Sequence, residues 1–180
     1  MLVIFDLNKT IIKPSFGNKR NNEKGYVIRP HFKELYSFLK ENGVKVGLYS
    51  FCRAKKFREV VLQFEEGGCV FDFLKNEFSD NKTNNKDMNS TGKKDLLLIS
   101  RETGICLDEI FLVEDDLRKC VVGQNYVLVS EFHGRGVDSK DGEGGGDSKD
   151  GVDREDTEML RVRDVFAEIL DIHKNENNKN

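Results

Sequence analysis

The chain has 180 residues, of which 37% are hydrophobic and 34% charged, and its formal net charge is -3. This length is sufficient for one domain with a buried core, and the charge balance does not provide the basic surface that nucleic-acid binding requires. No apolar run is long enough to span a bilayer, and the first residues have neither the basic start nor the cleavage site of a signal peptide. We therefore expect a nuclear or cytoplasmic protein without nucleic-acid or membrane partners.

Short apolar strands and amphipathic helices alternate along the first third of the sequence. Residues 2–5 are all apolar, which is typical of a buried strand, and Asp6 follows them directly. Apolar residues recur at intervals of three and four over 31–42, which predicts a helix with one buried face. A second apolar strand is predicted over 44–49, and Ser50 ends it.

The alternation continues to the end of the chain, and it predicts a central parallel sheet with helices on both faces. The third predicted core strand ends in three successive acidic residues. In chain order, the further predicted elements are a helix over 54–64, an extended piece over 70–73, an exposed loop over 79–92, a helix over 93–103, strands over 109–113 and 126–129, and a helix over 157–173.

Residues 134–153 differ in composition from the rest of the chain. They are rich in glycine and acidic residues, and the pentapeptide Asp-Ser-Lys-Asp-Gly occurs twice among them. Because so few apolar groups cannot offset the entropy of ordering, we expect a disordered insert. The predicted organisation is one domain formed by 1–133 and 154–174, interrupted by this insert and followed by a polar tail over 175–180.

Polar side chains follow the three strands that are predicted to be central. Asp6 follows the first strand, Ser50 ends the second, Asp115 and Asp116 follow the third, and a lysine pair at 93–94 precedes that third strand. The carboxyl ends of parallel strands form the ligand-binding edge of such a sheet. Carboxylates gathered there repel each other unless a cation joins them, and their hard oxygens favour Mg²⁺. A hydroxyl and an ammonium can then hold phosphate oxygens, which favours phosphoryl transfer through an aspartyl-phosphate.

These residues resemble the motifs of the haloacid-dehalogenase (HAD) superfamily. Asp-Leu-Asn-Lys-Thr at 6–10 is similar to its first motif, Asp-x-Asp-x-Thr, and the second, third and fourth motifs are matched by Ser50, Lys94 and Asp115-Asp116. The branch that the chain resembles is that of the phosphatases acting on the C-terminal domain of RNA polymerase II, the FCP/SCP homology or NLI-interacting-factor-like domain. The segments that carry this resemblance are Arg29-Pro30, Ala54-Lys55, Lys94-Asp95-Leu96 and Asp156-Thr157-Glu158-Met159. It implies a Rossmann-like three-layer α/β sandwich without a large cap domain.

The resemblance also implies a metal site. Asp6 would be both the nucleophile and a ligand of Mg²⁺. The backbone carbonyl of Asn8 and the carboxylate of Asp115 would be further ligands. Asp116 would be either a ligand or a neighbour of the ligands, although a helix cap is an equally good interpretation of this residue.

The transferred phosphoryl group has its own predicted contacts. By the same resemblance, Ser50 would bind the phosphoryl group, and Lys94 would neutralise its charge while holding Asp6 in place. Thr10 would fix the geometry of the loop that follows the nucleophile and would complete the phosphate site.

Asn8 departs from the pattern of the family. Active relatives have an aspartate here, which protonates the leaving oxygen and then activates water, and an asparagine cannot exchange a proton in that way. Loss of such a group typically costs about 10²–10⁴ in rate. Three interpretations stay open: a natural pseudophosphatase that keeps its phosphate pocket, a slow phosphatase that relies on water, and an engineered substitution.

The spacing of the motifs bears on the substrate. The interval from Thr10 to Ser50 is too short for an added cap domain, so the cleft would be open and would suit an extended phosphopeptide. We expect a monomeric phosphoprotein phosphatase for serine and threonine, acting on a partner such as the RNA polymerase II C-terminal domain and impaired by Asn8. One alternative is a module that binds phosphopeptides without turnover, as in the phosphatase-like mitochondrial import receptor. Another is a capless magnesium-dependent phosphatase for small substrates.

Overall fold

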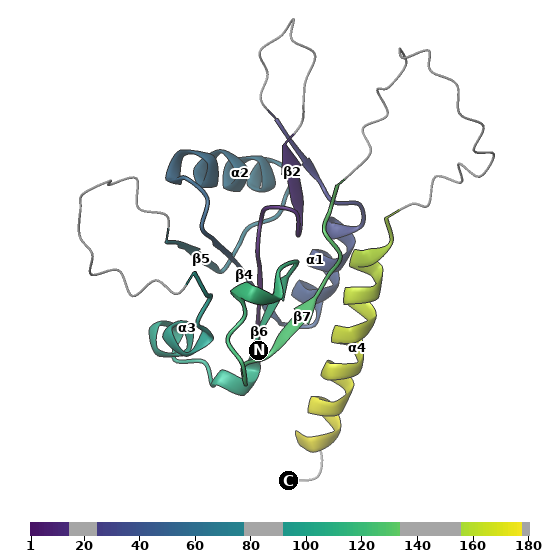
Figure 1. The fold of residues 1–180 in the computed structure, drawn as a ribbon. Helices are drawn as coiled ribbons and strands as arrows, with labels where there is room; N and C mark the ends of the chain where they lie inside the picture. Colours follow the sequence, from purple (N-terminus) through teal and green to yellow (C-terminus); the bar gives the residue numbers. More distant parts are fainter. Residues whose placement is uncertain (15–24, 78–91, 134–155, 178–180) are drawn as a thin grey trace, which may run out of the picture.

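A five-stranded sheet forms the centre of the computed structural model, in which every hydrogen-bonded pair of strands is parallel (Figure 1). The order of the strands is β5-β4-β1-β6-β7, so the three strands predicted to be central are neighbours. Their bounds are β1 Leu2–Phe5, β4 Lys45–Ser50, β5 Phe73–Asn76, β6 Ile110–Glu114 and β7 Tyr126–Leu128. The structure describes residues 1–14, 25–77, 92–133 and 156–177.

Helices cover both faces of this sheet. Alternate residues of β1 belong to two separate cores, with Val3 and Phe5 in one and Leu2 and Ile4 in the other. The first core is completed by helices α1 (Phe32–Glu41), α2 (Ala54–Glu66) and α4 (Glu158–Asn177), and the second by α3 (Leu96–Thr103). Helices α1 and α4 pack side by side (Figure 1). The predicted three-layer α/β sandwich is therefore confirmed.

The apolar face predicted for the first helix is the face that α1 buries. Its buried side chains recur at the expected spacing and are Phe32, Leu35, Tyr36 and Leu39. The Phe32 ring meets the ring of Phe5 edge-on, with 5.3 Å between the ring centroids. Such contacts between aromatic rings add to the stability gained from burying their apolar surface.

Helix α3 begins three residues later than predicted. Asp95 is its N-cap, and the Asp95 carboxylate accepts a hydrogen bond from the backbone N–H of Leu97 at 2.9 Å. A capping aspartate has a non-helical backbone, so it separates the helix from the lysines before it. Lys94 instead forms an isolated parallel bridge with Cys120. This extended backbone brings Lys94 beside the end of the sheet.

The edge strand β5 also begins later than the extended piece predicted over 70–73. The backbone N–H of Val46 in β4 donates a hydrogen bond to the side-chain carboxylate of Asp72 at 2.7 Å. In a regular strand pair, a backbone carbonyl would accept this hydrogen bond. The regular pairing with β4 therefore starts at Phe73, which lies opposite Gly47.

Four elements have no counterpart in the predicted list. Strands β2 (Ile12–Pro14) and β3 (Tyr26–Ile28) form a small antiparallel sheet, and two 3-10 helices, η1 and η2, cover Leu107–Glu109 and Leu117–Lys119. Helix α4 continues to Asn177, four residues beyond its predicted end, so half of the predicted polar tail is helical.

The predicted insert over 134–153 lies outside the described residues, as does the predicted loop over 79–92 apart from its last residue. The division of the chain into one interrupted domain thus stays a prediction. Within the ranges that the structure describes, no helix combines the length and the apolar character needed to cross a membrane.

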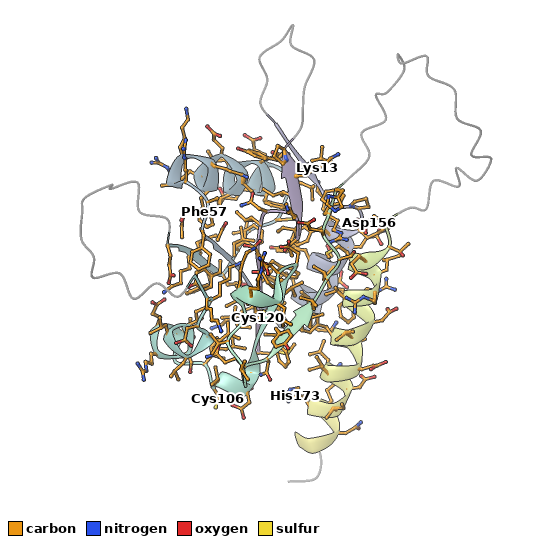
Figure 2. The ribbon with its side chains drawn as sticks, in the orientation of Figure 1. Lys13, Phe57, Cys106, Cys120, Asp156 and His173 are labelled. Atoms are coloured by element: carbon orange, nitrogen blue, oxygen red, sulfur yellow. The ribbon has the colours of Figure 1, made fainter. Side chains whose placement is uncertain are left out.

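The buried side chain of Arg29 joins three distant parts of the chain. Its guanidinium donates to Asp156 Oδ2 at 2.9 Å and to the backbone oxygens of Thr10 and Ser130 at 3.0 and 2.8 Å. Asp156 lies at the start of α4 (Figure 2). Two segments that carry the family resemblance, around Arg29 and Asp156, are thus in direct contact and hold the loop after β1.

Candidate active site

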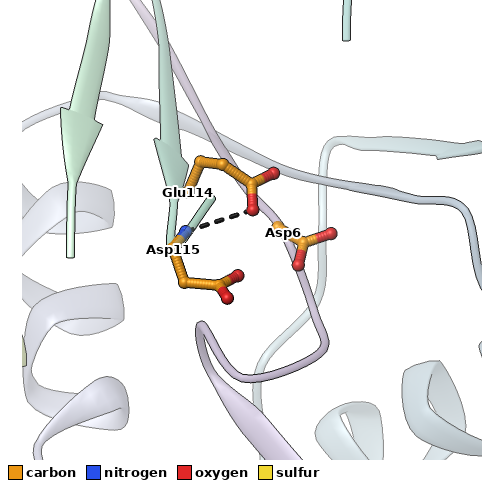
Figure 3. A group of neighbouring side chains, drawn as sticks. All are labelled: Asp6, Glu114 and Asp115. Atoms are coloured by element: carbon orange, nitrogen blue, oxygen red, sulfur yellow. Dashed lines mark hydrogen bonds between the residues drawn. The ribbon is translucent and has the colours of Figure 1, made fainter. Parts of the chain in front are cut away.

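The carboxyl ends of the central strands bring the predicted acidic residues together. Asp6 follows β1 and Asp115 follows β6, and these two strands are paired in parallel. Oxygens of Asp6, Glu114 and Asp115 all lie within 4.8 Å of one another (Figure 3). The topology therefore places the predicted nucleophile beside a predicted metal ligand.

Lys94 connects two of these carboxylates. Its ammonium donates a hydrogen bond to Oδ1 of Asp6 and another to Oε2 of Glu114, the latter at 2.7 Å. All three residues are at most 2% exposed. Buried charges are tolerated only when they are paired and hydrogen-bonded, and here one cation serves two anions. The neighbouring Lys93 is exposed, so Lys94 is the lysine of the pair that lies among these carboxylates, and its contact with phosphate stays a prediction.

Glu114 lies beside the predicted site residues, although it was not itself predicted to belong to the site. Besides Lys94, its carboxylate accepts from Lys119 Nζ at 2.9 Å and from the backbone N–H groups of Asp115 and Asp116 at 3.1 and 3.2 Å. Burial and the nearby Asp6 carboxylate raise the pKa of Glu114, while the two lysines oppose this shift. Because both oxygens already have partners, Glu114 anchors Lys94 rather than offering a vacant ligand atom.

Thr10 lies between the carboxylates of Asp6 and Asp115. Its hydroxyl lies 2.8 Å from Oδ1 of Asp115 and 3.5 Å from Oδ2 of Asp6. The loop before it turns through Lys9, which has a left-handed backbone with φ of 66°. Thr10 therefore lies between Asp6 and Asp115, and its predicted roles in fixing the loop and completing the phosphate site stay predictions.

Asn8 points its amide oxygen toward α2. Oδ1 accepts a hydrogen bond from the ammonium of Lys56, which also lies 5.2 Å from the centroid of the Tyr26 ring. Asn8 lines a cavity of about 370 Å³ together with Asp115 and Lys119. The partner Lys56 was missed by sequence reasoning, because one of two adjacent lysines near the start of an amphipathic helix carries no signal of its own.

Ser50 is fully buried at the end of β4, the strand on the other side of β1. Its hydroxyl oxygen accepts the backbone N–H of Cys52 at 3.2 Å. Burial raises the pKa of the Cys52 thiol, which favours the protonated and less reactive form. The structure thus places Ser50 at the predicted edge of the sheet, and its phosphate contact stays a prediction.

The side chain of Asp116 pairs with Arg118 and does not belong to the group of Asp6, Glu114 and Asp115. Its carboxylate caps η2 by accepting the backbone N–H of Arg118 at 3.0 Å, and it pairs with the Arg118 guanidinium at 2.8 Å. These hydrogen bonds lower the pKa of Asp116 to about 2. Asp116 lies outside the group of three close carboxylates, so its placement agrees with the capping interpretation and we do not assign it to the metal.

Lys119 is the other basic residue of the site that sequence reasoning missed. Its ammonium lies 2.9 Å from Glu114, 3.6 Å from Asp6 and 3.7 Å from Asp115. Although burial opposes the charged form, the Asp6 and Glu114 carboxylates raise the pKa of Lys119. The sequence offered no signal for Lys119, because a spacing of four residues predicts a contact only within a helix and Asp115 precedes the short helix η2.

The donor set fits a small divalent cation. Asp6 and Asp115 present carboxylate oxygens close together, and the Asn8 carbonyl belongs to the same loop as Asp6. Oxygen ligands of this kind suit Mg²⁺, which binds through one or two carboxylates and keeps several waters.

The chain is similar to known proteins in sequence and in fold. Residues 1–143 match the family model of the NLI interacting factor-like phosphatases, whereas no curated protein matches the chain in sequence. The solved structure of CbbY from Rhodobacter sphaeroides in complex with phosphate is similar in fold, with a TM-score of 0.50 and 11% identity over 73% of this chain and 86% of that one.

Two further solved structures are similar. A Had-superfamily hydrolase from Ehrlichia chaffeensis has a TM-score of 0.49 and 13% identity over 72% of this chain and 86% of that one. The RNA polymerase II CTD phosphatase Fcp1 of fission yeast, bound to beryllium fluoride, has a TM-score of 0.49 and 18% identity over 73% of this chain. The chain spans only 41% of the length of that Fcp1 chain.

The family match ends at residue 143, so the resemblance around Asp156 lies beyond it. The matched range, residues 1–143, nevertheless includes every residue of the site described above. With its HAD-like fold, this chain therefore belongs to the family of NLI interacting factor-like phosphatases.

Proposed function

We propose that the chain is a Mg²⁺-dependent phosphatase of phosphoserine and phosphothreonine in proteins, which acts through an aspartyl-phosphate and is slowed by Asn8. The observation that carries this proposal is the pairing of Asp6 with the buried ammonium of Lys94 beside the carboxylate of Asp115. A nucleophilic carboxylate must be ionised and held in one orientation, and the contact with Lys94 supports both conditions.

Asp6 would attack the phosphorus of the substrate. A bond forms between an Asp6 oxygen and phosphorus while the bond from phosphorus to the serine or threonine oxygen breaks. Lys94 keeps Oδ1 of Asp6 in a hydrogen bond, so the other oxygen is the one available for attack. The leaving serine or threonine oxygen takes its proton from water, because the amide of Asn8 does not supply one. A water molecule then attacks phosphorus, the bond from phosphorus to the Asp6 oxygen breaks, and inorganic phosphate leaves as Asp6 is regenerated.

The remaining residues would bind and orient the phosphoryl group. Ser50 and Lys94 can donate hydrogen bonds to its oxygens, because a hydroxyl and an ammonium are both donors. Thr10 holds Asp115 relative to Asp6 through its hydroxyl. Mg²⁺ held by Asp6, Asp115 and the backbone carbonyl of Asn8 would neutralise charge between the carboxylates and the phosphate.

Asn8 slows the proposed hydrolysis, because it stands where a proton donor for the leaving oxygen is needed. Its amide oxygen already accepts from Lys56, and an amide cannot deliver a proton to the leaving oxygen. A phenolate leaves without help more readily than a serine alkoxide. We therefore expect turnover of aryl phosphates to exceed turnover of phosphoserine peptides.

The test is the hydrolysis of an aryl phosphate in the presence of Mg²⁺. Asn8→Asp restores a carboxyl group that can activate water for hydrolysis of the aspartyl-phosphate, a step shared by aryl and serine phosphates, and should raise the rate about 10²-fold or more. Asp6→Asn removes the nucleophile and should abolish turnover in either background. If Asn8→Asp is as inert as the unchanged protein, the catalytic proposal is wrong.

A second candidate is a module that binds phosphopeptides without turnover. The contact between Lys56 and Asn8 favours it, because the position of the predicted acid holds an amide with a partner of its own. Fluorescence anisotropy with a phosphorylated peptide of the RNA polymerase II C-terminal domain separates the two candidates. Tight binding by both the unchanged protein and Asn8→Asp, without turnover by either, would support the module and exclude the enzyme.

A further inference from the structure

Lys119 places a positive charge inside the group of carboxylates that would hold a metal ion. Its ammonium is 3.6 Å from Oδ2 of Asp6 and 3.7 Å from Oδ1 of Asp115, the two carboxylates proposed as ligands. It also donates to Glu114 at 2.9 Å. The side chain is 27% exposed, so these pairs are largely shielded from solvent and from salt.

The backbone fixes the base of this side chain. Lys119 ends η2, and its carbonyl oxygen accepts the backbone N–H of Lys94 at 2.7 Å. Arg118, the preceding residue, has a side chain that is 90% exposed and pairs with Asp116. Two successive basic residues therefore have different surroundings, and Lys119 is the one that reaches the carboxylates.

The charges at the site show what Lys119 does there. Asp6, Glu114 and Asp115 bring three negative charges, and Lys94 neutralises one of them, which leaves two for a single divalent cation. Lys119 takes one of those two charges. Because a lysine ammonium and a divalent cation repel each other at such separations, the two compete for the same carboxylates.

We infer that Lys119 is a built-in counter-ion that weakens and thereby sets the affinity of this site for a divalent cation. It partly neutralises Asp6 and Asp115 when no ion is bound, and it withdraws toward the adjoining cavity when an ion binds. Lys119 itself lines that cavity, which has a volume of about 370 Å³. This inference rests on the proposed function, since it takes Asp6 and Asp115 as the ligands.

Calorimetric titration of the full chain with Mg²⁺, after removal of metals, tests the inference without any activity assay. Lys119→Met removes the competing charge while keeping much of the length of the side chain, and its Kd for Mg²⁺ should be about tenfold lower than that of the unchanged protein. Arg118→Met removes the same charge one residue away and is the matched control, whose Kd should not change. Asp115→Asn should lose the binding.

Thermal melting is a second measurement, which shows whether a variant is folded and whether Mg²⁺ stabilises it. Without the competing ammonium, the carboxylates repel each other, so Lys119→Met should melt at a lower temperature in a chelator and should gain more from added Mg²⁺. Lys119→Gln, which keeps hydrogen-bond donors, should behave likewise if the methionine variant does not fold.

The outcomes are distinguishable. If Lys119→Met and Lys119→Gln bind Mg²⁺ no more tightly than the unchanged protein while Asp115→Asn loses it, the inference is wrong and the proposed metal site stands. If no variant binds Mg²⁺ at all, including the two without the Lys119 charge, both the inference and the metal dependence of the proposed function are overturned.

Discussion

Lys94 is the residue on which the buried charges of the site depend. It is the partner of both Asp6 and Glu114, and all three are removed from solvent. Taking away one member of a buried ionic group leaves an uncompensated charge, and this is far more costly than the net contribution of the group. The same ammonium therefore matters for stability and for orienting the proposed nucleophile.

Lys94→Met should lower the free energy of unfolding by about 3–5 kcal/mol and abolish phosphatase turnover. Urea denaturation followed by circular dichroism measures the first effect. Lys93→Met is the control, because Lys93 is exposed and adjacent and should change stability by less than about 0.5 kcal/mol. Equal stability of the two variants would contradict the pairing described here.

The sequence predicted the acidic residues of this site better than it predicted their partners. Asp6 and Asp115 were found because they follow apolar strands, and topology alone then places them at one edge. Lys94 came from the family resemblance. Lys119 was missed because its neighbours depend on how the short helix η2 turns after β6, and no periodicity encodes that turn.

At the scale of elements, the first turn of α4 is tied to the edge strand β7. Glu158 accepts the backbone N–H of Ser130 at 3.1 Å and pairs with Arg161 at 2.8 Å. Arg161 in turn donates to the carbonyl of Leu128 at 2.7 Å. These contacts satisfy backbone groups at the end of β7 and just beyond it, and they hold α4 against the sheet.

Glu158→Gln should destabilise the protein by about 1 kcal/mol at neutral pH, since it removes a charged acceptor that is partly exposed. The hydrogen bond from Arg161 lowers the pKa of Glu158 below its ordinary value of 4.5. A carboxylate with a lowered pKa contributes stability above its unfolded pKa and loses that contribution as the pH falls. The difference between the two proteins should therefore shrink well below pH 4.5.

Urea unfolding at neutral and acidic pH measures this difference. Glu168→Gln makes the same change at an exposed position on the same helix and should show no such dependence. A constant difference between Glu158→Gln and the unchanged protein at all pH values would contradict the role given to the ionised carboxylate.

The long elements were predictable, and the short ones were not. Strands β1, β4 and β6 are uninterrupted or nearly uninterrupted apolar runs, and α1 shows its buried face in its spacing. Strands β2 and β3 have three residues each and exist only through their mutual pairing, which a local pattern does not reveal. The start of α3 was misplaced because the capping role of Asp95 was not considered.

At the scale of the whole molecule, Arg29 holds together parts that are remote in sequence. One guanidinium reaches Thr10 after β1, Ser130 after β7 and Asp156 before α4, and it lies 5.4 Å from the centroid of the Phe132 ring. Only a planar fork with several donors can serve these partners together. The start of the last helix is thereby connected to the loop that carries the predicted catalytic residues.

Arg29→Lys should test this connection, because it keeps the charge and loses the fork. A single ammonium cannot reach all the acceptors, and buried acceptors left without a donor cost free energy. We expect a loss of about 2–4 kcal/mol in the free energy of unfolding, together with slower turnover of an aryl phosphate through displacement of the Thr10 loop. Arg163→Lys, at a more exposed position of α4 where the guanidinium pairs with Asp164 at 3.4 Å, is the control and should change neither quantity. If Arg29→Lys retained full stability, a simple positive charge would suffice at this position, and the coupling between the last helix and the catalytic loop would have to arise from packing alone.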